Sequence, residues 1–88
     1  MIVYSKDNCG WCTKTIEALA ARGIEATVFK LNVDYSREDL HDMMVKKLGR
    51  TDFALTLPQV LDYKGKIIGG YAETIEYLES ISTGENYD

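Results

Sequence analysis

Two cysteines lie three positions apart near the start of the chain, and its 88 residues contain no others. Cys9 and Cys12 follow a short apolar run and precede a pattern typical of a helix, where a C-x-x-C pair indicates a dithiol that closes and reopens a disulfide. A disulfide closing so short a loop contributes only about 2 kcal/mol to stability before strain is subtracted. The spacing therefore favours redox chemistry over a structural bridge.

The chemistry of this pair depends on which sulfur is ionised. Only a thiolate attacks a disulfide, and a free cysteine with a pKa of about 8.5 is mostly protonated at neutral pH. We expect Cys9 at a helix N-terminus, where the helix dipole and the cations of Lys6 and Lys14 lower that pKa, partly opposed by Asp7. Cys12 would lie one turn deeper. We therefore predict that Cys9 attacks the substrate disulfide and that Cys12 resolves the mixed disulfide.

The elements that position this pair alternate between strands and helices. Short apolar runs between turn residues predict strands, and apolar residues at helical spacing predict helices. The predicted strands are 2–4, 26–33, 58–62 and 66–69, and the predicted helices are 9–22, 36–49 and 71–82. The resulting order, β-α-β-α-β-β-α, indicates an α/β fold with right-handed crossovers and an antiparallel hairpin near its end.

The second predicted helix carries its own start and stop signals. Ser36 followed three residues later by Asp39 resembles a capping box, and Gly49 is placed to end the helix. Its apolar stripe consists of Leu40, Met43, Met44 and Leu48. His41 falls on the polar face, where a solvated side chain is a simpler interpretation than a base or a metal ligand.

Length and composition indicate one small soluble domain, which we expect to span residues 1–82, with a polar tail at 83–88. Hydrophobic residues make up 45% of the chain, and a chain of this length can bury roughly 60–65% of its unfolded surface without a metal or several disulfides. The net charge of -4 lacks the basic excess of a nucleic-acid-binding protein. The N-terminal apolar run is too short for a signal peptide or a membrane span, so we expect a cytoplasmic protein without a membrane partner.

The order of these elements, together with three motifs, resembles the glutaredoxins. The motifs are Cys9-Gly10-Trp11-Cys12, Thr56-Leu57-Pro58-Gln59-Val60 and Gly69-Gly70. The resemblance implies a thioredoxin fold, in which three helices flank a central four-stranded mixed sheet. The long loop at 48–55 is most similar to that of the small dithiol glutaredoxins of tailed bacteriophages, which are also described as thioredoxins.

The resemblance also implies a substrate site beside the dithiol. In related proteins a cis proline at the position of Pro58 faces the dithiol, and the backbone of the preceding residue, here Leu57, pairs with an extended thiol substrate. Trp11 replaces the usual tyrosine between the cysteines and would shield the sulfur. An exposed aromatic at this position is more typical of substrate contact than of packing.

Glutathione would bind at the start of the last helix. Its γ-glutamyl carboxylate would lie near Gly70 and the N–H groups of Ala72 and Glu73, and Lys6 would pair with its other end. For the sequence alone, a turn is the simpler interpretation of the glycines. Glu73 also stands where related proteins commonly have aspartate.

The resemblance implies a dithiol thiol–disulfide oxidoreductase with no permanently bound cofactor, no metal and no nucleic-acid partner, which uses glutathione as co-substrate. We expect a monomer that reduces glutathione mixed disulfides and protein disulfides, with ribonucleotide reductase as an expected acceptor, in the host cytoplasm if the protein is phage-encoded. Three alternatives stay open: a thioredoxin-like reductant served by a flavoprotein reductase, a dimer holding a [2Fe–2S] cluster, which Gly10 in place of proline would allow, and a scaffolding partner. Zinc is disfavoured, because one C-x-x-C and His41 do not supply four ligands.

Overall fold

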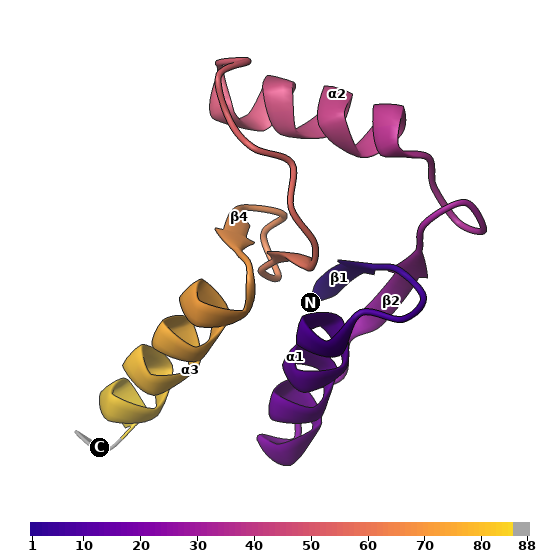
Figure 1. Ribbon diagram of the computed structural model, residues 1–88. Helices are drawn as coiled ribbons and strands as arrows, with labels where there is room; N and C mark the ends of the chain where they lie inside the picture. The colour runs from indigo at the N-terminus through magenta and orange to yellow at the C-terminus, as the bar shows by residue number, and fades with distance from the viewer. Residues whose placement is uncertain (86–88) are drawn as a thin grey trace.

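The computed structural model describes residues 1–85, which form four strands and three helices in the predicted order. They are β1 (Ile2–Ser5), α1 (Gly10–Ala21), β2 (Thr27–Lys30), α2 (Arg37–Leu48), β3 (Gln59–Leu61), β4 (Ile67–Gly69) and α3 (Tyr71–Glu85). The strands form one sheet in the order β2-β1-β3-β4, in which β1 is parallel to β2 and antiparallel to β3, and β3 is antiparallel to β4. This mixed sheet confirms the predicted α/β thioredoxin fold (Figure 1).

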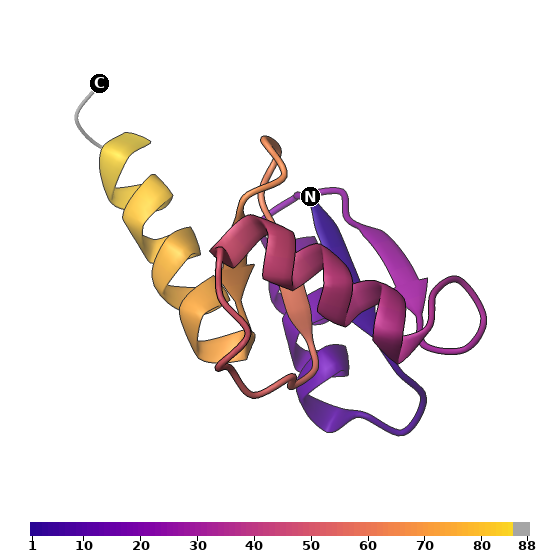
Figure 2. The same cartoon turned by 90° about the horizontal axis from the view of Figure 1, so that it is seen from above.

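Helices cover both faces of the sheet, with α2 on one face and α1 and α3 on the other (Figures 1 and 2). Val3 and Val60 are paired across β1 and β3, and both are fully buried in one cluster with Leu19 of α1 and Leu78 of α3. Because side chains alternate along a strand, the buried Leu61 faces the α2 side. The main core therefore lies between the sheet and the α1–α3 layer.

Helix α2 begins and ends as predicted. The Ser36 hydroxyl accepts the Asp39 N–H over 3.1 Å, the Asp39 carboxylate accepts the Ser36 N–H over 3.3 Å, and Gly49 ends the helix at a left-handed φ of 72°. Of its predicted apolar stripe, Leu40, Met43 and Met44 are buried or partly buried, but Leu48 is 39% exposed. The buried part of the stripe is thus one turn shorter than we expected.

Strand β2 is also shorter than predicted, since the expected strand 26–33 ends at Lys30. The carbonyl of Lys30 accepts the backbone N–H groups of Val33 and Asp34, and the Asp34 carboxylate accepts the Lys30 N–H over 2.9 Å. Asn32 takes a positive φ of 65° within this turn. Local turn hydrogen bonds therefore replace strand pairing at the end of the predicted strand, and Val33 is 73% exposed.

The turn between β3 and β4 lies where the sequence predicts it, around residues 63–65. The Asp62 backbone N–H donates to the Lys66 carbonyl, and the Asp62 carboxylate accepts the backbone N–H groups of Lys64 and Lys66 over 2.8 and 2.9 Å. Hydrogen bonds from Lys66 and Lys64 lower the pKa of Asp62, although burial opposes them. This network holds the hairpin at the end of the sheet away from the dithiol.

Helix α3 extends to Glu85. Residues 83–85, which we expected in the polar tail, are therefore helical, and residues 86–88 of that tail lie outside the described residues. Of the helices that the structure describes, none combines the length and the apolar character needed to cross a membrane.

Candidate active site

Cys9 and Cys12 form a disulfide across the first turn of α1, with their Cα atoms 5.2 Å apart. Cys9 is the N-cap residue, with extended backbone at φ -114° and ψ 103°, and its Sγ accepts the Cys12 N–H over 3.2 Å. Cys9 is partly exposed, whereas Cys12 is only 2% exposed. One sulfur is thus reachable and the other lies behind it, which is the arrangement that an attacking and a resolving cysteine require.

The start of α1 favours a negative charge on the outer sulfur. Unpaired N–H groups and the positive end of the helix dipole stabilise anions at a helix N-terminus. The first turn of α1 contains no acidic residue. Asp7, the nearest acidic residue before the helix, forms an ion pair with Lys30 at 3.1 Å. Its opposition to a Cys9 thiolate is therefore weaker than we expected from the sequence.

Trp11 lies at the surface between the two cysteines and connects α1 to α3. Its side chain is 56% exposed, and its ring centroid lies 5.2 Å from that of Tyr71, the first residue of α3. The Lys14 Nζ lies 4.8 Å from the same Trp11 ring, in a cation–π contact. The indole is therefore held by contacts on two sides while much of its surface stays open to a substrate.

A groove of about 270 Å³ lies beside Trp11. Its lining residues come from α1, the loop before β3 and the start of α3: Trp11, Thr56, Leu57, Pro58, Gly70, Tyr71, Ala72 and Glu73. Both views place that loop next to the N-terminal end of α1 (Figures 1 and 2). The peptide bond between Leu57 and Pro58 is cis, as the resemblance implies. The fold thus brings six of the predicted substrate-site residues into one groove.

Two further residues of the groove were not predicted as site residues, and one predicted residue lies elsewhere. Thr56 belongs to the motif Thr56-Leu57-Pro58-Gln59-Val60. Tyr71 directly follows the paired glycines, and an aromatic at that position could have indicated a site residue. Lys6 is not one of the described residues that line the groove. It is exposed in the segment before Cys9. Any contact of Lys6 with a ligand would therefore be made outside this groove.

A side chain of α3 itself caps the backbone at the start of this helix. The Glu73 Oε1 accepts the Gly70 N–H over 2.8 Å. The Gly70 carbonyl accepts the Thr74 N–H and hydroxyl over 3.0 and 2.8 Å, and Thr74 is fully buried. A carboxylate therefore already lies where the sequence led us to expect an incoming one.

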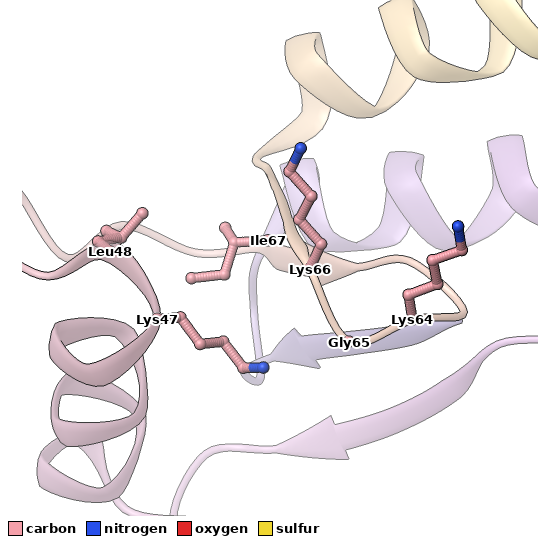
Figure 3. A pocket seen from close by; sticks show the side chains of 6 residues that line it. All are labelled: Lys47, Leu48, Lys64, Gly65, Lys66 and Ile67. Atoms are coloured by element: carbon pink, nitrogen blue, oxygen red, sulfur yellow. The ribbon is translucent and has the colours of Figure 1, made fainter.

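A second hollow, of about 320 Å³, lies between the end of α2 and the β3–β4 turn, and it is lined by Lys47, Leu48, Lys64, Gly65, Lys66 and Ile67. Figure 3 shows Lys64 and Lys66 directed to one side of the hairpin and Lys47 to the other, so the three ammonium groups do not converge. Nothing in this arrangement positions a reacting group. The hollow is thus no competitor to the groove beside the dithiol.

His41 lies in a third hollow, between α2 and the loop before β3. Its side chain is 44% exposed, and its ring stacks on that of Phe53 with centroids 5.2 Å apart. The solvated interpretation is therefore incomplete, because one face of the imidazole is covered. In the part of the chain that the structure describes, no three His, Cys, Asp or Glu side chains are grouped so as to hold a metal ion.

Comparisons with known proteins agree with this architecture. The model of the glutaredoxin family matches residues 1–68. Glutaredoxin 1 from Francisella tularensis, solved in complex with cacodylate, superposes with a TM-score of 0.72 at 20% identity, covering 93% of this chain and 94% of its own. A buckwheat glutaredoxin, solved as a glutathione complex, superposes with a TM-score of 0.68 at 23% identity, covering 90% and 67%. No curated protein sequence matches the chain.

Proposed function

The chain belongs to the glutaredoxin family, and we propose that it is a glutathione-dependent thiol–disulfide oxidoreductase that works through Cys9 and Cys12. One observation carries the proposal: the two sulfurs form a disulfide at the N-cap of α1, one partly exposed and one buried. A structural role for so short a disulfide would contribute only about 2 kcal/mol. The open groove beside the pair gives a substrate a place to bind.

The first step is attack by Cys9. In the reduced protein, the Cys9 thiolate forms a bond to one sulfur of the substrate disulfide, and the substrate S–S bond breaks. The other substrate sulfur leaves with the electron pair and takes up a proton from solvent. The N–H of Cys12, which points at the Cys9 sulfur, and the α1 dipole stabilise the thiolate before attack.

The second step is resolution by Cys12. Cys12 gives its proton to solvent, its sulfur bonds to that of Cys9, and the mixed disulfide breaks to release the second substrate thiol. The substrate has then gained two electrons and two protons, and the protein has reached the disulfide form seen in this structure. Two glutathione molecules restore the dithiol and leave as glutathione disulfide.

Substrate binding is assigned to the groove. We propose that an extended substrate pairs with the backbone of Leu57 beside Pro58, in the manner of strand addition, while Trp11 covers the reacting sulfurs. Glutathione would use the same groove, with one end near Ala72 and the other toward Lys6. The glutathione complex of the buckwheat neighbour, which has the same fold, supports this co-substrate.

The physiological acceptor is proposed by resemblance. The long loop before β3 is similar to that of the phage glutaredoxins, so we propose a protein disulfide, with ribonucleotide reductase as the candidate, reduced by a monomer in the host cytoplasm. A coupled assay that supplies either glutathione with glutathione reductase or a flavoprotein thioredoxin reductase tests the electron donor. Turnover with the glutathione system alone is the expected result, and turnover with thioredoxin reductase alone would replace the proposal with the thioredoxin-like alternative.

The redox poise of the pair provides a second test. The fraction of Cys9–Cys12 disulfide is measured at equilibrium in glutathione buffers of graded ratio, since an offset of about 30 mV corresponds to about 1.4 kcal/mol for a two-electron couple. A dithiol that glutathione reduces within those ratios supports the proposal. A disulfide that stays closed at every ratio contradicts it.

A further inference from the structure

The residue directly before the attacking cysteine has an uncommon backbone conformation. Among residues 1–85, two residues other than glycine have a positive φ: Asn8 at 54° and Asn32 at 65°. This left-handed region is unfavourable for residues with a β-carbon, although asparagine tolerates it better than most. Because Asn8 is exposed, burial of its side chain does not explain the conformation.

The chain is anchored on both sides of Asn8. On one side, the Asp7 carboxylate forms an ion pair with Lys30 of β2 at 3.1 Å. On the other side, the Cys9 carbonyl accepts the N–H and the hydroxyl of Thr13 in α1 over 3.1 and 3.2 Å. Asn8 is therefore the joint between a residue tied to the sheet and a residue tied to the helix.

The left-handed turn at this joint leads the chain into the N-cap. After Asn8, Cys9 is extended at φ -114° and ψ 103°, which is the usual backbone of an N-cap residue. In this geometry its Sγ accepts the Cys12 N–H over 3.2 Å. A negative φ at position 8 would direct the chain differently into Cys9, so both this contact and the place of the sulfur at the helix dipole would change.

We infer that Asn8 is a positioning residue, whose left-handed backbone places the Cys9 sulfur at the N-terminus of α1 and thereby sets the reactivity of that sulfur. The role belongs to the backbone of Asn8, and its side chain is not assigned a contact with substrate. The consequence for turnover rests on the proposed oxidoreductase function. The placement of the sulfur can be measured without it.

Two substitutions at position 8 separate the backbone from the side chain. Asn8→Gly removes the side chain and adopts a positive φ readily. Asn8→Val introduces a β-branched side chain, for which this φ is a clear outlier. The matched control is Asn32, which is also an exposed asparagine with a positive φ, in the turn after β2. Asn32→Val therefore carries the same backbone penalty outside the segment that holds the dithiol.

The first measurement is the rate at which iodoacetamide alkylates Cys9 in the reduced full-length protein as the pH is varied. We expect Asn8→Val to react about tenfold more slowly than the wild type at neutral pH, because less thiolate is present, and to reach its half-maximal rate at a higher pH. A tenfold change, about 1.4 kcal/mol, is of the size of the penalty for a left-handed residue. Asn8→Gly and Asn32→Val should keep the wild-type profile.

The second measurement is kcat/KM for a glutathione mixed disulfide, which should fall by a similar factor in Asn8→Val and stay unchanged in the other two variants. Thermal unfolding should show that Asn8→Val and Asn32→Val are destabilised alike, which separates a loss of stability from a loss of reactivity. Should Asn8→Val not fold, Asn8→Ala and Asn32→Ala give the same comparison with a smaller side chain.

Three results would overturn the inference. They are a wild-type alkylation profile in Asn8→Val, a loss in Asn8→Gly as large as in Asn8→Val, which would place the role in the side chain, and equal losses in Asn8→Val and Asn32→Val. Failure of the wild type to turn over the mixed disulfide is a different result. It would remove the proposed function, whereas the alkylation profiles would still decide whether Asn8 positions the sulfur.

Discussion

The backbone N–H of Cys12 donates a hydrogen bond to the sulfur of Cys9 across 3.2 Å. This contact joins the partly exposed sulfur to the first turn of the helix that buries its partner. Hydrogen bonds from backbone N–H groups are stronger when the acceptor is charged. The same short segment therefore stabilises a thiolate at Cys9 and holds Cys12 buried behind it.

Single substitutions of the two cysteines should have unequal effects. Cys12→Ser should retain most of the turnover of glutathione mixed disulfides, because that reaction needs only the attacking sulfur, whereas Cys9→Ser should abolish it. Reduction of protein disulfides by Cys12→Ser should stop at the mixed disulfide, which mass spectrometry detects. Equal loss in both variants would contradict the assignment of roles.

Alkylation of the reduced protein should distinguish the same two sulfurs. Cys9 should react with iodoacetamide faster than the buried Cys12, and its rate should reach half-maximum below the pH of about 8.5 expected for a free cysteine. Mass spectrometry of the peptides reports each site. The unfolded protein in urea is the control, since both cysteines should react alike there; equal rates in the folded protein would sink the prediction.

Trp11→Ala should weaken substrate turnover more than stability. Because the side chain is 56% exposed, its removal costs little packing, but the contact with Tyr71 and the wall of the groove are lost. We expect kcat/KM to fall by an amount equivalent to about 0.5–1.5 kcal/mol, as for other aromatic contacts. Tyr63→Ala, which removes a 71% exposed aromatic at the β3–β4 turn, should leave kcat/KM unchanged; a similar loss in both variants would argue against a substrate contact.

Tyr35 should make stability fall at alkaline pH. Its hydroxyl donates to the Ser5 carbonyl over 2.7 Å, and burial raises its pKa, helped by Tyr4 and opposed by Arg37. The folded protein holds this proton more tightly than the unfolded chain does. Its contribution is therefore complete below the unfolded pKa of about 10 and is lost as the pH rises through the higher folded value.

The test of this dependence is urea unfolding of the wild type and Tyr35→Phe at about pH 8 and about pH 11. At the lower pH, the wild type should be more stable than Tyr35→Phe by about 0.5–1.5 kcal/mol, because the variant lacks the hydrogen bond to Ser5. The difference should shrink at the higher pH, where only the wild type has a phenol at position 35 to ionise. A difference that does not change with pH would show that the tyrosine is not responsible.

Ser36→Ala should remove one half of the capping box that starts α2. The lost hydrogen bond to the Asp39 N–H should lower the free energy of unfolding by about 1 kcal/mol. Ser80→Ala, on the exposed face of α3, is the matched control and should change stability little. An equal effect of the two substitutions in denaturant titrations would remove the capping interpretation.

Features that depend on neighbouring residues could be predicted from the sequence. The order of strands and helices, the capping box of Ser36 and Asp39, the end of α2 at Gly49 and the position of the dithiol at the start of α1 were all predicted, because each depends on contacts within a few positions. The recognised motifs added the cis bond before Pro58, which spacing and composition could not supply.

The way in which distant segments meet could be seen only in the folded chain. The groove joins Trp11 with Pro58 and Gly70, and Phe53 covers one face of His41, which no periodicity could indicate because these residues come from separate elements. The place of the Glu73 carboxylate in that groove was likewise hidden, although the residue was noted. Side-chain direction depends on the local space, and at Gly69 and Gly70 that space exists only once the helix has formed against the sheet.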